Sequence, residues 1–248
     1  MQGTGAQDDP YIVTTAQELY DIRAGGSTPG TTSTWYRQGN DITIPPELSE
    51  IWCLGTNAQK IYNFREYAGN GYKVSGLNFN EPSVDNVGLF PIVSTTTKNI
   101  RDLGVDCNIV GGNNVGGICG SNSNGSSYGS SITNCYATGA VSGTSNVGGL
   151  CGSNSSSYGT STITNCYATG AVSGSSNVGG ICGLNEGRSG SYVNARIIGC
   201  FALNPKIIRD KYAPANDTFG RIFGASSSHT LDRNYALETM LFYPNGDE

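Results

Sequence analysis

The segment Ser131-Ile-Thr-Asn-Cys-Tyr-Ala-Thr-Gly-Ala-Val-Ser-Gly143 returns almost unchanged as Thr162-Ile-Thr-Asn-Cys-Tyr-Ala-Thr-Gly-Ala-Val-Ser-Gly174, 31 residues further along the chain. A second element, Asn146-Val-Gly-Gly-Leu-Cys-Gly152, returns as Asn177-Val-Gly-Gly-Ile-Cys-Gly183 at the same spacing. A fixed period of this length is typical of solenoids, because a single repeat must bury its apolar face against a neighbouring repeat. We therefore expect a stack of coils.

The repeat extends in both directions and aligns apolar residues in columns. The Val-Gly-Gly half gives Val87, Val115, Val147, Val178 and Phe219 in one column, and Phe90, Cys119, Cys151, Cys182 and Phe223 in a second. The other half gives Val74, Ile100, Ile132, Ile163, Ile197 and Leu231, followed by Leu77, Leu103, Cys135, Cys166, Cys200 and Asn234. These columns predict the core positions that stack from coil to coil.

The residue types favour strands over helices. The segments between glycines alternate short apolar and polar residues and are rich in β-branched and aromatic side chains. Glycine accounts for 36 of 248 residues, which disfavours stacked helical pairs because each glycine costs a helix about 1 kcal/mol. Among all-β alternatives, propeller blades need roughly 40–50 residues. We predict a parallel β-helix of about six coils, with Ser121–Ser130 and Ser153–Ser161 as projecting loops.

Caps are expected at both ends, because a solenoid otherwise exposes unpaired strand edges. Thr15-Ala-Gln-Glu18 is a capping-box pattern followed by Leu19 and Ile22, which predicts a short helix at about 15–24. We expect one domain overall. It divides into a flexible N-terminus and helical cap at 1–34, β-helix repeats at 35–202, and the last coil with a C-terminal cap at 203–248.

Charge and hydropathy argue against several classes of partner. The net charge is −5 with 14 basic residues and no basic patch, so we expect no nucleic-acid binding. No apolar run approaches 18 residues, so we expect no membrane span. Abundant Ser, Thr, Asn, Gly and Tyr at low charge is typical of secreted surface proteins. We expect an extracellular or cell-surface monomer whose native signal peptide is absent from this sequence.

The Val-Gly-Gly-(Leu/Ile)-x-Gly element beside Asn-Cys-Tyr-Ala-Thr-Gly-Ala-Val-Ser-Gly resembles the GLUG-repeat family of bacterial surface proteins. The resemblance covers about residues 35–240 and implies a right-handed parallel β-helix in an adhesin-like or filamentous-haemagglutinin-like protein. It implies no catalytic residues and no cofactor. The chain departs from the family at Cys119, Cys151 and Cys182, where members commonly have Val.

Two interpretations of the repeated cysteines are open. The eight cysteines include no Cys-x-x-Cys, so we expect no metal site. The six in the columns either serve as small buried hydrophobic residues or form disulfides from one coil to the next. The second interpretation pairs Cys119 with Cys135, Cys151 with Cys166, and Cys182 with Cys200.

Two sets of aromatic residues are candidate ligand contacts. Tyr136 and Tyr167, followed by Phe201 and Tyr235, come directly after the cysteine column and are predicted to point outward. Tyr128, Tyr158 and Tyr192 are placed at the ends of the projecting loops. Aromatic rings on the outer face are suited to packing against the rings of sugars. The alternative is a self-stacking ladder that stabilises the coils by about 0.5–1.5 kcal/mol per pair.

Asparagine columns have structural interpretations only. Asn114, Asn146 and Asn177, and likewise Asn134 and Asn165, are predicted to form side-chain amide ladders or turn caps.

The favoured function is that of an adhesin-like binding protein for a glycan or an extracellular or host protein. The rival is a structural stalk or spacer. A carbohydrate-active enzyme is the least favoured, because the segment from Cys107 to Asn185 contains no Asp, Glu, Lys, Arg or His. Acid–base chemistry needs groups that titrate near neutral pH. We therefore expect a protein that is not an enzyme.

Overall fold

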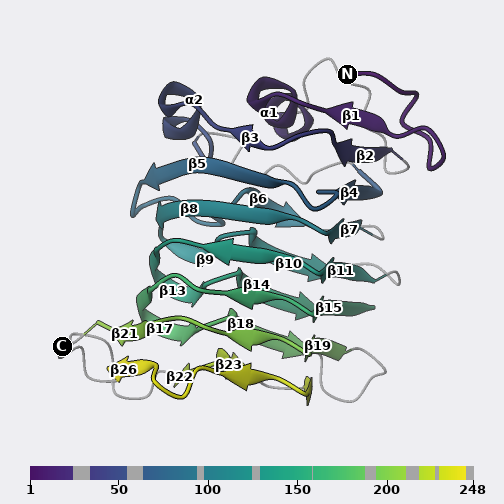
Figure 1. The fold of residues 1–248 in the computed structure, drawn as a ribbon. Helices are drawn as coiled ribbons and strands as arrows, with labels where there is room; N and C mark the ends of the chain where they lie inside the picture. Colours follow the sequence, from purple (N-terminus) through teal and green to yellow (C-terminus); the bar gives the residue numbers. More distant parts are fainter. Residues whose placement is uncertain are drawn as a thin grey trace.

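The computed structural model describes residues 1–24, 34–54, 64–93, 98–124, 129–157, 159–187, 194–210, 218–226 and 229–243. Within these ranges the chain forms a parallel β-helix whose coils stack from the N-terminal to the C-terminal end (Figure 1). Three sheets, called A, B and C here, run along the stack. The all-β solenoid predicted from the repeats is confirmed.

Each sheet collects equivalent strands from successive coils. Sheet A contains β1 (Tyr11–Val13), β2 (Trp35–Gln38), β4 (Glu66–Ala68), β7 (Lys98–Arg101), β11 (Ser130–Thr133), β15 (Thr160–Thr164), β19 (Asn194–Ile198) and β24 (His229–Asp232). Sheet C contains β6 (Phe90–Val93), β10 (Cys119–Asn124), β14 (Cys151–Ser156), β18 (Cys182–Gly187) and β23 (Phe223–Ser226).

Sheet B has the most strands of the three sheets. It contains β3 (Ile42–Thr43), β5 (Lys73–Asn80), β8 (Gly104–Val110), β9 (Asn113–Gly116), β12 (Tyr136–Thr138), β13 (Val141–Gly148), β16 (Tyr167–Ala168), β17 (Val172–Gly179), β20 (Phe201–Ala202), β21 (Lys206–Arg209), β22 (Phe219–Gly220), β25 (Tyr235–Ala236) and β26 (Leu241–Tyr243).

The described residues make about five complete coils rather than six. Sheet C contributes one strand to each complete coil, and it has five strands. Sheet A extends further, because β1 and β2 precede these coils and β24 follows them. In the central coils, register partners such as Ile100, Ile132 and Ile163 follow one another at 32 and then 31 residues. The predicted period is confirmed.

Most predicted columns are true register partners. Phe90, Cys119, Cys151, Cys182 and Phe223 align across sheet C. Val115, Val147, Val178 and Phe219 align across sheet B, and Val87 bridges to Val115. Ile100, Ile132, Ile163, Ile197 and Leu231 align across sheet A. The valines, isoleucines and cysteines of these columns are buried, so the columns form the core.

The predicted columns are wrong in the first coil. Tyr67, and not Val74, pairs with Ile100 in sheet A. Val74 lies in sheet B between Ile42 and Val105, and Leu77 pairs with Cys107. The register shifts between Val74 and Leu77, where Gly76 adopts a φ of +81°. This irregularity changes the offset between partners by only one residue. The misalignment of Val74 arises because Tyr67 takes the place of isoleucine in sheet A, while the apolar Val74 belongs to sheet B.

Left-handed residues recur at two corners of the coils. The corner after sheet A uses Asp102, Asn134, Asn165, Gly199 and Arg233, with φ values from 52° to 63°. The other corner uses Asn86, Asn114, Asn146 and Asn177, with φ values from 51° to 58°. Asparagine tolerates this conformation better than most residues, which explains its recurrence at fixed positions.

Two short helices lie at the N-terminal end of the stack (Figure 1). The expected helix is α1 (Ala16–Ala24), and its capping box forms: Thr15 Oγ1 accepts from the Glu18 amide, and Glu18 accepts from the Thr15 amide, both at 3.2 Å. Leu19 and Ile22 are buried as predicted. The sequence analysis missed α2 (Pro46–Glu50), which begins at a proline and buries Leu48.

The serine-rich segments are shorter loops than expected. Strand β10 continues to Asn124 and β11 begins at Ser130, while β14 continues to Ser156 and β15 begins at Thr160.

Toward the C-terminal end of the stack, the predicted boundary between residues 202 and 203 falls within the fifth coil. Strands β21, β22 and β23 of that coil follow it, and β24, β25 and β26 then form a partial coil.

Candidate functional site

The outward aromatic residues form one row on sheet B, here called the aromatic column: Tyr136, Tyr167, Phe201 and Tyr235. Each belongs to a strand of two or three residues that follows the left-handed corner after sheet A. The next residues in these strands include Ala137, Ala168 and Ala202, which are buried. Because side chains alternate along a strand, the buried alanines place the aromatic rings on the outer face.

The rings stack in pairs and become more exposed toward the C-terminal end. Tyr136 and Tyr167 are 4.9 Å apart between ring centroids with an interplanar angle of 7°, and Phe201 and Tyr235 are 5.3 Å apart at 20°. Exposure rises from 37% at Tyr167 to 45% at Phe201 and 57% at Tyr235. The self-stacking expected as the alternative is therefore present within these two pairs. It leaves the last two rings as the largest apolar surface of the column.

Polar residues flank the first two rings of the aromatic column, Tyr136 and Tyr167, on both sides. Two residues before each ring lies the corner row, where Asn134 donates to Asp102 Oδ1 at 3.0 Å and Asn165 is exposed. Two residues after the rings lie Thr138 and Thr169, and Leu203 continues that row. At Tyr136 and Tyr167 the strip therefore offers both apolar contact and hydrogen bonds, whereas Leu203 extends the apolar surface beside Phe201.

The tyrosines placed at the loop ends lie outside the described residues: Tyr128, Tyr158 and Tyr192. Their role as ligand contacts stays a prediction. They are a different set of tyrosines from Tyr136 and Tyr167, which the structure places on the outer face of sheet B.

The structure holds all eight cysteines as buried free thiols. Neighbouring sulfurs meet within a column: Cys119 Sγ lies 3.3 Å from Cys151 Sγ, and the Cys135 amide donates to Cys166 Sγ at 3.4 Å. The disulfide interpretation left open by the sequence, with bonds from Cys119 to Cys135, Cys151 to Cys166 and Cys182 to Cys200, does not correspond to these free thiols. The arrangement corresponds to the other interpretation, in which cysteine serves as a small buried residue.

Four of the eight thiols, Cys107, Cys119, Cys166 and Cys182, are poorly suited to chemistry. Burial raises the pKa of Cys107 to about 12, with a contribution from Asp106. Burial also holds the pKa values of Cys119, Cys166 and Cys182 well above the usual range. Because the thiolate is the reactive form, buried thiols with raised pKa values are inert.

The expected asparagine ladder is confirmed at the second corner. Asn146 Nδ2 donates to Asn114 Oδ1 at 2.8 Å, and Asn177 Nδ2 donates to Asn146 Oδ1 at 2.7 Å. The sequence analysis missed a second, fully buried ladder in sheet C. There, Asn122 donates to Asn154 at 2.8 Å, and Asn154 donates to Asn185 at 2.7 Å. The sequence signal for this ladder is the Ser-Asn pair that recurs at Ser121-Asn122 and Ser153-Asn154, which the sequence analysis assigned to loops.

Two further expectations concern metals and membranes. In the described ranges, His, Cys, Asp and Glu side chains form no cluster of three suited to a metal ion. Among the same residues, no helix has the length and apolar character needed to cross a membrane.

Fold and surface together define a parallel β-helix with an outward aromatic strip. The GLUG motif matches residues 111–142 and 143–173. Over 147 residues, or 57% of this chain, the sequence is 31% identical to halomucin of Haloquadratum walsbyi, and the match spans 2% of that protein. The crystal structure of a "putative immunoglobulin A1 protease" from Bacteroides ovatus superposes with a TM-score of 0.66. That match covers 99% of this chain and 80% of the other, and its 20% identity shows a shared fold only.

Proposed function

We propose that the chain is a binding module of a secreted or cell-surface protein. In this proposal it contacts a glycan, or a glycosylated extracellular protein, through the aromatic column. The observation that carries the proposal is the row of outward rings that ends in Phe201 and Tyr235, which are 45% and 57% exposed. Contiguous exposed apolar surface rimmed by polar groups is typical of an interaction site.

The chemistry of the strip suits a sugar chain. A pyranose ring presents an apolar C–H face and a rim of hydroxyl groups. The rings of the aromatic column supply the apolar contact, and the neighbouring Thr138, Thr169 and Asn165 supply hydroxyl and amide groups. The rings are ordered by the strands, so little side-chain entropy is lost on binding.

The extracellular setting rests on composition and on the comparisons. The chain has few charges and many Ser, Thr, Asn and Gly residues, and it shares the GLUG motif. The names halomucin and immunoglobulin A1 protease belong to the proteins that carry them. For this chain we propose binding rather than catalysis, because the segment from Cys107 to Asn185, which carries Tyr136 and Tyr167, contains no Asp, Glu, Lys, Arg or His.

A structural spacer is the second candidate, and the ring stacking favours it. Tyr136 and Tyr167 lie nearly parallel at 4.9 Å, so each covers part of the other. Such a pair is worth about 0.5–1.5 kcal/mol to the fold without any ligand.

A glycan and host-protein array with the full chain tests the proposal. We expect saturable binding that is lost in the Phe201→Ala/Tyr235→Ala double variant and retained in Ile51→Ala. Ile51 is a matched control because it is an exposed apolar residue, 43% accessible, at the opposite end of the stack. A separate triple substitution of Tyr128, Tyr158 and Tyr192 to Ala tests the loops. An array without binding, or binding indifferent to the double variant, would overturn the proposed site.

A further inference from the structure

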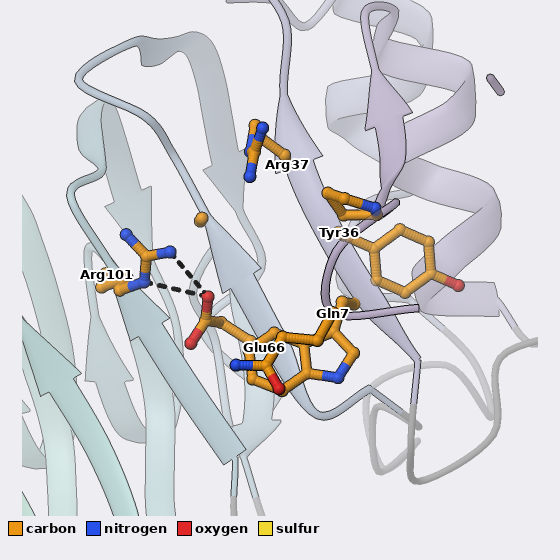
Figure 2. A pocket seen from close by; sticks show the side chains of 8 residues that line it. Gln7, Tyr36, Arg37, Glu66 and Arg101 are labelled. Carbon is orange, nitrogen blue, oxygen red and sulfur yellow. Dashed lines mark hydrogen bonds and ion pairs between the residues drawn. The ribbon is translucent and has the colours of Figure 1, made fainter. Parts of the chain in front are cut away.

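A second candidate site lies on sheet A, near the N-terminal end of the stack. A pocket of about 220 Å³ opens where the N-terminal segment passes over β2, β4 and β7. Gln7 and Pro10 line it from that segment, and Trp35, Arg37 and Arg101 line it from the strands. Figure 2 shows Arg37 at one end, Gln7 at the other and the Glu66–Arg101 pair along the side.

The strand register builds this pocket. Arg37, Ala68 and Arg101 are partners on three successive strands, and Trp35 pairs with Glu66 in the row beside them. Tyr36 and Tyr67 are buried between these residues, so the partners alternate to the outer face. Ala68 fills little space between two long arginines, whose backbones are about 9.6 Å apart by strand spacing. The missing side-chain volume at Ala68 leaves the hollow.

The two arginines that line the pocket differ in their ion pairs. Arg101 donates to Glu66 Oε1 from Nε at 2.9 Å and from Nη2 at 2.8 Å, and it also pairs with Asp102 at 2.6 Å. Arg37 is exposed and has no ion pair with a described residue. Arg101 is therefore held by two carboxylates, and Arg37 is the cation available to a ligand.

We propose that this pocket binds one carboxylated sugar residue, such as a uronic acid. Arg37 meets the carboxylate, because a guanidinium suits planar carboxylate recognition. The indole of Trp35 packs on the C–H face of the ring. Gln7 and the second carboxylate oxygen of Glu66 bond the hydroxyl groups at the other end. The volume lies below the roughly 300–1,000 Å³ of pockets for drug-sized ligands, so a single sugar residue is the appropriate size.

The same charges disfavour other anions. A phosphate bears nearly two negative charges at neutral pH, and it would meet only one free guanidinium beside the Glu66 carboxylate. An ionised carboxylate accepts but does not donate hydrogen bonds, so Glu66 selects hydroxyl groups. A ligand with a carboxylate at one end and hydroxyls at the other satisfies both.

The two tryptophans allow a direct test on the full chain by ¹H–¹⁵N NMR. Trp35 lines the pocket, whereas Trp52 is fully buried and its indole donates to the Leu89 carbonyl at 3.0 Å. Glucuronate is titrated against glucose, which lacks the carboxylate, and acetate, which lacks the ring. We expect glucuronate to move the Trp35 indole signal saturably while the Trp52 signal stays in place. Glucose should bind at least about tenfold more weakly, since a hydrogen bond to a charged group contributes a factor of this size. Acetate should also bind at least about tenfold more weakly, because it lacks the ring and the hydroxyl groups that Trp35, Gln7 and Glu66 would contact.

Variants separate this site from the aromatic column on sheet B. Arg37→Gln should reduce glucuronate affinity to the level of glucose, and Arg233→Gln, at an arginine with 72% side-chain exposure, should not. Phe201→Ala/Tyr235→Ala should leave the titration unchanged, so the two proposals fail independently. No Trp35 shift, equal binding of acetate or glucose, or an unaffected Arg37→Gln variant would overturn the inference.

Discussion

Gly152 lies where the backbones of neighbouring coils approach most closely. A Cβ at this position would overlap the backbone of Asn114 and Val115. Gly120 and Gly183 meet the preceding coil in the same way, which explains why the Val-Gly-Gly-(Leu/Ile)-Cys-Gly element ends in glycine. A rigid backbone neighbour cannot move aside as a side chain can.

Gly152→Ala is therefore expected to destabilise the fold by about 1–3 kcal/mol, the usual range for overpacking. Urea unfolding followed by circular dichroism measures the change. Thr144→Ala, at an exposed position one strand earlier, is the control and should lie within about 0.5 kcal/mol of the wild type. Equal midpoints for Gly152→Ala and the wild type would contradict the close approach.

Tyr36 makes the free energy of unfolding depend on pH in the alkaline range. Burial, with a contribution from Tyr11, raises the pKa of Tyr36 to about 12 from its usual value of 10.0. Between about pH 10 and 12 the unfolded chain loses this proton while the folded chain keeps it, so stability falls as pH rises. Urea midpoints at pH 8 through 12 should decline above about pH 10. Tyr36→Phe should decline less steeply, and an identical decline would show that other groups are responsible.

At the scale of elements, two thiol ladders fill the interior where sheets meet. Cys119 and Cys151 are in contact in one ladder, and Cys166 contacts Cys135 in the other. A Cys column and a Val column differ little in packing, because a thiol behaves as a small hydrophobic group. The free, buried thiols require no oxidising environment to complete the fold.

Thiol counting tests these ladders on protein prepared without reductant. The native chain should react slowly with a thiol reagent, because burial raises the pKa of thiols such as Cys107 and excludes the reagent. After unfolding in denaturant, all eight cysteines should react. Six fewer reactive thiols, or any loss in pairs, would establish disulfides and contradict the ladders.

The repeats themselves determined what could be predicted at this scale. Cys135 and Cys166 were placed one coil apart because both follow Ile-Thr-Asn, and the register of Tyr136 with Tyr167 confirms it. In the first coil the alignment failed, because Tyr67 replaces isoleucine in sheet A and the aliphatic residue chosen instead, Val74, belongs to sheet B. The buried ladder through Asn154 was missed because polar composition indicated a loop, whereas amides bonded to one another are stable inside.

Across the whole molecule, helices α1 and α2 lie at the N-terminal end of the stack (Figure 1). Their position covers sheet edges that another solenoid would extend, which favours a binding module over an open spacer array. The sequence predicted the outward aromatic column from strand alternation. It did not predict the pocket beside Arg37, because that pocket depends on residues from segments far apart in the chain.

The most direct test of the proposed binding face compares affinity with stability in one pair of proteins. The strongest array ligand is titrated against the wild type and the Phe201→Ala/Tyr235→Ala variant, and both are unfolded in urea. The loss of one stacked pair should cost about 0.5–1.5 kcal/mol of stability. Affinity should fall at least about tenfold, because the most exposed rings of the column are gone. A variant that is destabilised to this extent but binds the ligand as tightly as the wild type would contradict the account and leave the aromatic column as a purely structural ladder.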